Sequence, residues 1–192
     1  MTATRPPLPQ GEGLGVRSIG ARALAVLGGV LLVALGAQAA IPLPGTPVPL
    51  TLQGPTVLIV GALLGPGLGA ASMALYLLLG AAGLPVFAPT GLPGIARLFG
   101  PTGGSLLAFP LAAALVGVII RDTRSWGRIA LGLIVGLATI YAGGIAQLAI
   151  LGGDMSTALR IGTAPFIIVD LCKLAIAAAV IRSFGPGLRA RL

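Results

Sequence analysis

Residues that do chemistry in water are scarce in this chain. It has 192 residues, of which none is histidine, one is cysteine, one is lysine and four are acidic, while aromatic residues make up 4%. So few ligands exclude a metal centre or a catalytic pair of carboxylates within the membrane, and a single cysteine excludes an internal disulfide. The only lysine lies between a cysteine and a leucine, so a phosphate-binding Gly-Lys-Ser/Thr loop is missing. We therefore expect no enzyme, no metal, no cofactor and no ATP hydrolysis by the chain itself.

Long apolar runs dominate what is present. Hydrophobic residues make up 56% of the chain and charged residues 8%, and the mean hydropathy is +1.06. Residues 23–96 contain no Asp, Glu, Lys or Arg, although one membrane span needs only about 20 apolar residues. We therefore expect an all-α, multi-pass integral membrane protein. The formal charge of +8 comes from arginines clustered between apolar runs, so we interpret it as a topology signal and expect no nucleic acid as partner.

Six transmembrane helices account for the apolar runs. Gly65-Pro-Gly67 is typical of a turn and splits one run into two short helices. We expect a flexible cytoplasmic tail over 1–16, a six-helix membrane domain over 17–182 and a basic cytoplasmic tail over 183–192. A secretory signal is the alternative for the first run, because Ala37-Gln-Ala39 at its end imitates a signal-peptidase site. The expected spans are residues 23–40, 54–64, 68–82, 105–120, 129–152 and 163–181.

The arginines predict the orientation of these helices. Six spans place both termini on one side, and the terminal arginines and the basic turn of residues 121–128 then lie in the cytoplasm, as the positive-inside rule expects. Residues 41–53, 83–104 and 153–162 lie outside, the last as an exposed polar turn. The four prolines of the first segment favour an extended path, and the second segment is rich in glycine and proline. We expect both to be ordered outer loops that cover a cavity; a plain connector is the alternative for the first.

Asp170 and Lys173 are the strongest candidate site. They lie three residues apart, on one face of a helix, in the last apolar run, where each charge is costly unless it is paired or faces a polar cavity. If the helix starts at Thr163, they lie about 10 and 15 Å from its outer end. An acid, a base and Arg97 in the second outer loop suit a small solute with an amide-like group and a carboxylate. A structural ion pair between two helices is the alternative.

Because the chain has no ATP-binding site, energy for uptake of such a solute has to come from a partner protein or from a gradient. Ala21, Ala25 and Gly29 form a stripe of small residues, spaced by four, on the first helix, and we expect a partner membrane protein to dock there. Ordinary packing between helices of the same chain is the alternative.

Six strings of residues follow one another along the chain. They are Ile41-Pro-Leu-Pro-x-Thr-Pro-Val-Pro-Leu-Thr-Leu-Gln53, Leu64-Gly-Pro-x-x-Gly69, Tyr76-Leu-Leu-Leu-Gly80, Gly83-Leu-Pro-Val-Phe-Ala88, Gly100-Pro-Thr-Gly-Gly104 and Asp170-x-x-Lys173. In this order and at compatible spacing, they resemble the BioY family, the biotin-binding S components of energy-coupling-factor transporters. The resemblance covers residues 20–182. It implies a six-helix protein of a bacterial-type cytoplasmic (inner) membrane that captures biotin outside and passes it inward with an energising module of two ATPases and one transmembrane coupling protein.

The resemblance also implies roles for single residues. Asp170 and Lys173 would hold the ureido ring of biotin, Arg97 would meet its valerate carboxylate near the mouth, and the two outer loops would close over the ligand. Ala21 and Ala25 match the family's Ala-x-x-x-Ala coupling motif in type. Weaker candidates for ligand contacts are Thr51, Gln53, Phe87 and Tyr76.

Several other functions stay open on the sequence. Within transporters, the alternatives are an S component for another vitamin and a solitary carrier that works without ATPases. A purely structural membrane subunit would have no need of Asp170 or Lys173, and a membrane enzyme would need a catalytic base or metal ligands that the sequence lacks.

Overall fold

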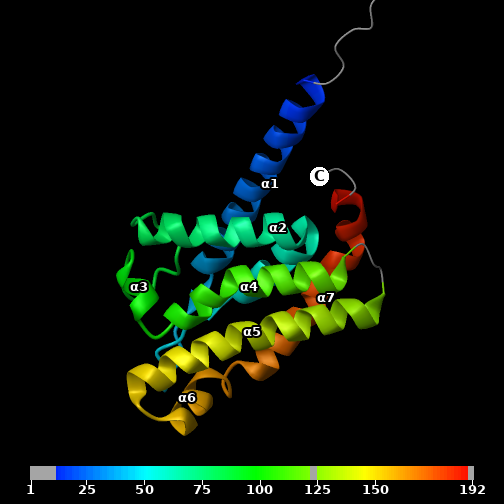
Figure 1. The fold of residues 1–192 in the computed structure, drawn as a ribbon. Coiled ribbons are helices and arrows are strands. Elements are labelled where there is room, and N and C mark those ends of the chain that lie inside the picture. The colour runs from blue at the N-terminus through cyan, green and yellow to red at the C-terminus, as the bar shows by residue number, and fades with distance from the viewer. Residues whose placement is uncertain (1–11, 122–124, 190–192) are drawn as a thin grey trace, which may run out of the picture.

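The computed structural model describes residues 12–121 and 125–189; predictions for the outermost parts of both tails and for Arg124 lie outside the described residues. The described residues form helices and a two-stranded sheet (Figure 1). The elements are α1 (Glu12–Gln38), β1 (Ala40–Ile41), β2 (Leu50–Thr51), α2 (Gln53–Ala81), α3 (Ala96–Phe99), α4 (Gly103–Ile120), α5 (Trp126–Gly152), α6 (Met155–Gly162) and α7 (Ile167–Arg189).

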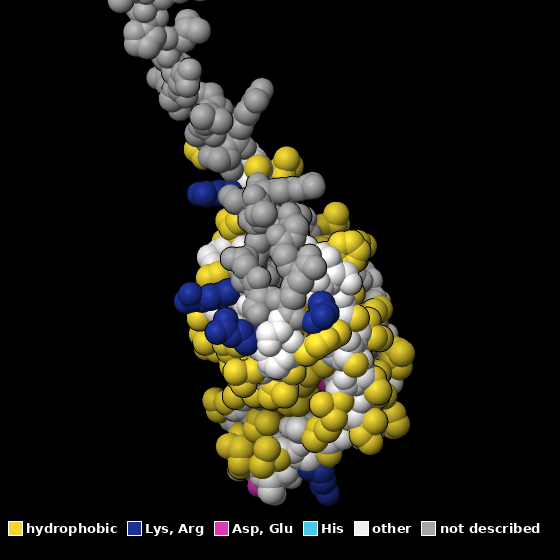
Figure 2. Space-filling model, turned by 90° about the vertical axis from the view of Figure 1, so that its right-hand side faces the viewer, with side chains coloured by type: hydrophobic (Ala, Val, Ile, Leu, Met, Phe, Trp, Pro, Cys, Tyr) yellow, Lys and Arg dark blue, Asp and Glu magenta, His cyan; other side chains and the backbone are white. Residues whose placement is uncertain are grey.

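The helices have the length and composition of membrane spans. Four of the described helical segments pass this test, Ile19–Gln38 of α1 and the whole of α2, α4 and α5. The pair α6 and α7, bent by 51° at a short break, makes a fifth if both cross together. Hydrophobic side chains cover most of the outer face in Figure 2, because lipid tails rather than water lie against it. The expectation of an all-helical membrane protein is confirmed.

Helix α2 turns back on itself at Gly65. This residue has φ 82° and ψ 178°, a left-handed backbone that glycine adopts without strain, and Pro66 follows it. The amide nitrogen of Gln53 lies 2.6 Å from the hydroxyl of Tyr76, although 23 residues of straight helix would separate them by about 35 Å. Two antiparallel helices therefore make up α2, and the predicted break at Gly65-Pro-Gly67 is confirmed.

Helix α4 lies at the centre of the bundle, between α2 and α5 (Figure 1). Glycines let the backbones approach on both sides of it. A Cβ on Gly61 of α2 would lie 2.4 Å from the carbonyl oxygen of Ala113, and a Cβ on Gly104 of α4 would lie 2.0 Å from that of Gly143 in α5. No side chain fits at either position. Such close contacts matter in lipid because helix association there depends on van der Waals packing rather than on escape from water.

The two ends of the bundle differ in character (Figure 1). The start of α1, the end of α7, the break in α2, the end of α4 and the start of α5 lie at the upper right of the view, and the β1–β2 pair, α3 and α6 lie at the lower left. Residues 12–16, predicted to be part of a flexible tail, are helical, and α7 continues to Arg189 through most of the predicted basic tail. Both helices extend past the predicted ends of the membrane domain, because an existing helix extends at little cost.

The proline-rich first loop is extended and ordered, as predicted. Strands β1 and β2 pair antiparallel, with Ala40 opposite Thr51 and Ile41 opposite Leu50. The second loop is ordered as well and carries the short helix α3. Both loops lie at the same end of the bundle (Figure 1), where they border the cavity described below.

The polar turn predicted over residues 153–162 is wrong. Most of that segment forms α6, and the carboxylate of Asp154 starts this helix by accepting hydrogen bonds from the backbone N–H groups of Ser156 and Thr157, at 3.1 and 2.9 Å. Hydrogen bonds from the side chain and backbone of Thr157, and then from those of Ser156, lower the pKa of Asp154 because they favour the charged carboxylate. The Asp-x-Ser-Thr start was the signal that the sequence offered for this helix.

Candidate ligand-binding site

A cavity opens at the end of the bundle that carries the β1–β2 pair and α3. It has about 780 Å³ of empty space, which includes the open solvent at its mouth. Most of its lining side chains are apolar, and the polar ones come from several elements. The lining residues are Val48, Pro49, Leu50, Thr51, Gln53, Gly54, Pro55, Phe87, Ala88, Arg97, Thr102, Ser105, Leu106, Phe109, Leu137, Ile140, Tyr141, Gly162, Phe166, Asp170 and Lys173.

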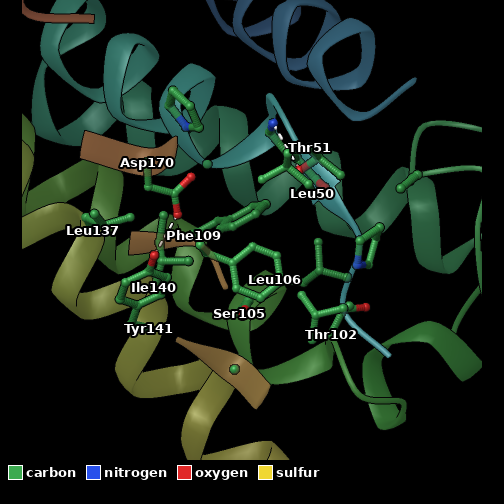
Figure 3. Close-up of a pocket in the computed structure, with 18 of the residues that line it drawn as sticks. Leu50, Thr51, Thr102, Ser105, Leu106, Phe109, Leu137, Ile140, Tyr141 and Asp170 are labelled. Atoms are coloured by element: carbon green, nitrogen blue, oxygen red, sulfur yellow. Dashed lines mark hydrogen bonds between the residues drawn. The ribbon is translucent and has the colours of Figure 1, made fainter. Parts of the chain in front are cut away.

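A hydrogen-bonded cluster joins three elements at one wall of the cavity. Lys173 Nζ on α7 donates to Asp170 Oδ1 at 3.0 Å and to the backbone carbonyl of Thr51 in β2 at 2.7 Å. Tyr141 on α5 donates from its hydroxyl to Asp170 Oδ2 at 2.6 Å, and Figure 3 shows these two side chains pointing toward one another. The Lys173 and Asp170 side chains are only 11% and 13% exposed. The ammonium has three N–H groups and these bonds use two, so one donor and the free lone pairs of the carboxylate can serve a ligand.

The predicted depth of the charged pair is corrected by the break before α7. This helix begins at Ile167 rather than at Thr163, so Asp170 and Lys173 lie only about 5 and 9 Å along it. The non-helical turn over residues 163–166 carries Phe166 to the cavity. The charged pair was placed on one face of a helix correctly, but the local break in the helix was not foreseen.

Arg97 lies in the cavity wall formed by the second loop. Its side chain is 5% exposed, and α3 holds it so that the guanidinium donates to the backbone carbonyls of Ala88 at 3.0 Å, Leu92 at 3.4 Å and Thr90. The loop therefore wraps around the guanidinium. All these partners are neutral, so a buried positive charge borders the cavity without a carboxylate among its hydrogen-bond partners, an arrangement that favours binding of an anionic ligand group.

The weaker candidates divide into lining and supporting residues. Gln53 and Phe87 line the cavity, and Thr51 does so with its carbonyl held by Lys173. Tyr76 does not contact the cavity; it is fully buried behind the wall, with its ring edge-on to Phe87 at a centroid distance of 5.4 Å. A tyrosine in a span gives the same sequence signal in either place, and only the packing of α2 puts Tyr76 behind Phe87.

The small-residue stripe of α1 faces partly inward. A Cβ on Gly29 would lie 2.7 Å from the hydroxyl of Ser72 and 3.0 Å from Val60, both on α2. Gly29 is therefore buried in an internal helix contact and offers no surface to a partner, which corrects the docking role predicted for it. Ala21 and Ala25, nearer the start of α1, are half-buried.

Tyr141 is the functional candidate that the sequence did not provide. Its 29-residue separation from Asp170 gives no periodicity to read. The residue type was the available signal, because Tyr141 is one of two tyrosines in the chain and a hydroxyl in the middle of a span indicates a functional residue. The apolar residues of the cavity wall were not predicted either, because their separations along the sequence follow no period. In the view of Figure 3, Phe109 and Leu106 lie between the Asp170–Tyr141 pair and Thr102.

Known proteins are similar to this chain in sequence and in fold. The sequence profile of the BioY family matches residues 11–190. The chain is 40% identical over 149 residues to the biotin transporter BioY of Thermotoga maritima (78% of this chain, 86% of that protein) and 33% identical over 173 residues to that of Rhizobium etli (85% and 92%). The crystal structure of the S-component for biotin from an ECF-type ABC transporter matches with a TM-score of 0.75 at 25% identity, over 91% of this chain and 94% of that one. The chain belongs to the BioY family.

Proposed function

We propose that this protein is a biotin transporter that captures biotin from outside the cell in the cavity at the loop-bearing end of the bundle. The observation that supports this proposal most strongly is the Asp170–Lys173 pair, which borders that cavity and is hydrogen-bonded to Tyr141 and to the Thr51 carbonyl. A pair that only joined helices would have no need of an open cavity beside it. Relatives named as biotin transporters support the ligand.

Biotin has the groups that the cavity walls can bind. Its ureido ring offers N–H donors to Asp170 and a carbonyl oxygen to the third N–H of Lys173. Phe109 and the other apolar walls cover the bicyclic ring, whose burial contributes to affinity in proportion to the apolar area removed from water. The valerate carboxylate meets the buried charge of Arg97, at the wall formed by the second loop.

In the membrane, the chain crosses six times with both termini in the cytoplasm. The two halves of α2 are roughly 18 and 24 Å long and count as two short spans, and α6 with α7 counts as one broken span. The arginines near the start of α1, near the end of α7 and between α4 and α5 then lie inside. The cavity opens outward, as capture requires.

Transport is energised by a partner, an energy-coupling module with a transmembrane coupling protein and two ATPases. The likeness to an S-component of an ECF-type transporter supports this assignment. Ala21 and Ala25 remain the candidate docking surface on α1. A solitary carrier and an S component for another vitamin are the competing assignments. Biotin uptake by cells with and without the coupling module decides the first, since a solitary carrier takes up biotin equally well in both.

Calorimetric titration of the detergent-purified protein tests the ligand and the site together. We expect tight binding of biotin, no binding of riboflavin or thiamine, and loss of biotin binding in Lys173→Ala. The matched control is Arg160→Ala, which removes an exposed basic residue of α6 and leaves binding unchanged. Absence of biotin binding by the unaltered protein rejects the ligand, and full binding by Lys173→Ala rejects the site.

A further inference from the structure

Three polar groups form a hydrogen-bonded chain at the edge of the cavity. The side-chain amide of Gln53 donates to the hydroxyl of Tyr76 at 2.6 Å, and this hydroxyl donates to the backbone carbonyl of Val86 at 2.9 Å. Tyr76 is fully buried, whereas Gln53, 7% exposed, lines the cavity. The chain therefore connects a cavity-lining amide with the start of the second loop.

The single proton of the phenol decides how the amide is oriented. Because that proton goes to the Val86 carbonyl, Tyr76 can only accept from Gln53, and the NH₂ group of the amide must face it. In the flipped orientation, Gln53 Oε1 and the Val86 carbonyl would compete for one proton, and a buried oxygen would lose its partner. The amide oxygen of Gln53 therefore faces away from Tyr76, and the residue that carries it lines the cavity.

We propose that Gln53 Oε1 accepts a hydrogen bond from an N–H group of the bound molecule and that Tyr76 is the positioning residue that aims it. The inference rests on the proposed function, since the ureido ring of biotin has two N–H groups on opposite sides of one carbonyl. Asp170 accepts from one N–H, Gln53 accepts from the other, and Lys173 donates to the carbonyl between them.

The backbone between the two acceptors supports this arrangement. The carbonyl oxygen of Thr51 accepts from Lys173 at 2.7 Å, and the hydroxyl of the same residue accepts from the backbone N–H of Gln53 at 3.2 Å. Thr51 thus contacts both Lys173 and the backbone of Gln53, so the start of the Gln53 side chain lies at the same end of the cavity as the charged pair. A fixed acceptor also gives selectivity, because a ring with an oxygen or a methylated nitrogen in place of the N–H leaves Gln53 Oε1 unpaired.

A cycle of protein variants and ligand analogues tests the assignment. Gln53→Met keeps the length of the side chain and removes the acceptor. Calorimetry compares the unaltered protein with this variant for biotin, for the two biotins methylated at one ureido nitrogen, and for biotin methyl ester. We expect the substitution to weaken biotin about ten-fold, the size typical of one buried hydrogen bond. We compare the dissociation constant of Gln53→Met with that of the unaltered protein for each ligand. For one of the N-methyl biotins this ratio should fall from about ten to about one, because the N–H that Gln53 binds is missing. For biotin methyl ester the ratio should stay at about ten, because the ester alters the other end of the ligand.

The outcomes separate this inference from the proposed function. If the unaltered protein binds no biotin, the proposed function fails. The Gln53 assignment is overturned if the unaltered protein binds biotin and Gln53→Met weakens the binding of biotin and of both N-methyl analogues by the same factor. It is also overturned if Gln53→Met has no effect on biotin binding. Tyr76→Phe tests the positioning role: it should reduce the discrimination between biotin and the same N-methyl analogue, whereas a merely structural role would lower the melting temperature and leave that discrimination intact. The Gln53→Met cycle decides the assignment even if Tyr76→Phe does not fold.

Discussion

Neutralising one member of the Asp170–Lys173 pair should harm the protein more than neutralising both. The two charges are 3.0 Å apart with little exposure, which gives a gross attraction of about 5 kcal/mol at an effective dielectric constant of about 20. Desolvation and side-chain ordering offset a large part of this, and we expect a net coupling of about 2 kcal/mol. Lys173→Met leaves the carboxylate buried without its cation, which should lower the free energy of unfolding by about 3 kcal/mol. Asp170→Asn in the Lys173→Met background removes the uncompensated charge and keeps an oxygen that accepts from Tyr141.

The assay is a double-mutant cycle on thermal unfolding in detergent, followed by intrinsic fluorescence in the absence of biotin. Lys173→Met should lower the melting temperature by about 5–10 °C, and adding Asp170→Asn should recover about half of that loss. If the effects of the two substitutions simply add, within about 0.5 kcal/mol, the charges are not coupled and the electrostatic reasoning is refuted. Loss of biotin binding is expected in both single variants and in the double variant, because each removes a ligand contact.

Three further predictions follow from single contacts. Tyr141→Phe removes the hydroxyl that donates to Asp170 and should weaken biotin binding about ten-fold in calorimetry, with the apolar packing of the ring kept; unchanged affinity would show that Asp170 needs no orienting donor. Gly104→Val should prevent accumulation of folded protein in size-exclusion chromatography, because its Cβ would lie 2.0 Å from the Gly143 carbonyl oxygen, whereas Gly28→Val, with nothing within 4 Å, is the tolerated control; equal yields would contradict the close α4–α5 packing. The pKa of Asp154 is lower in the folded protein than in the unfolded chain, where it is about 4, so its cap stabilises α6 at pH values above 4. This stabilisation is lost as the pH falls toward the pKa of Asp154 in the folded protein. The melting temperature of Asp154→Ala should therefore lie below that of the unaltered protein at pH 7 and approach it as the pH drops below 4, and a difference independent of pH would exclude the charged cap.

Much of the architecture follows from local features of the sequence. Apolar runs long enough to cross a membrane, and arginines between them, are properties of single segments and predict an all-helical membrane protein. The break at Gly65 was predictable because proline follows a glycine, and the extended first loop because prolines recur in it. The same applies to Asp170 and Lys173, whose three-residue spacing alone places them on one face of a helix.

The sequence by itself therefore determined the class of protein, the family likeness and the charged pair, and tertiary structure decided what surrounds that pair. Thr51 lies 122 residues from Lys173, and Tyr141 lies 29 residues from Asp170, yet each is within hydrogen-bond distance. Separations of this kind carry no helical period, because they depend on how α7 packs against α5 and against the strand β2. The orientation of the Gln53 amide is likewise a tertiary property, since it depends on a single proton that Tyr76 gives to a loop carbonyl.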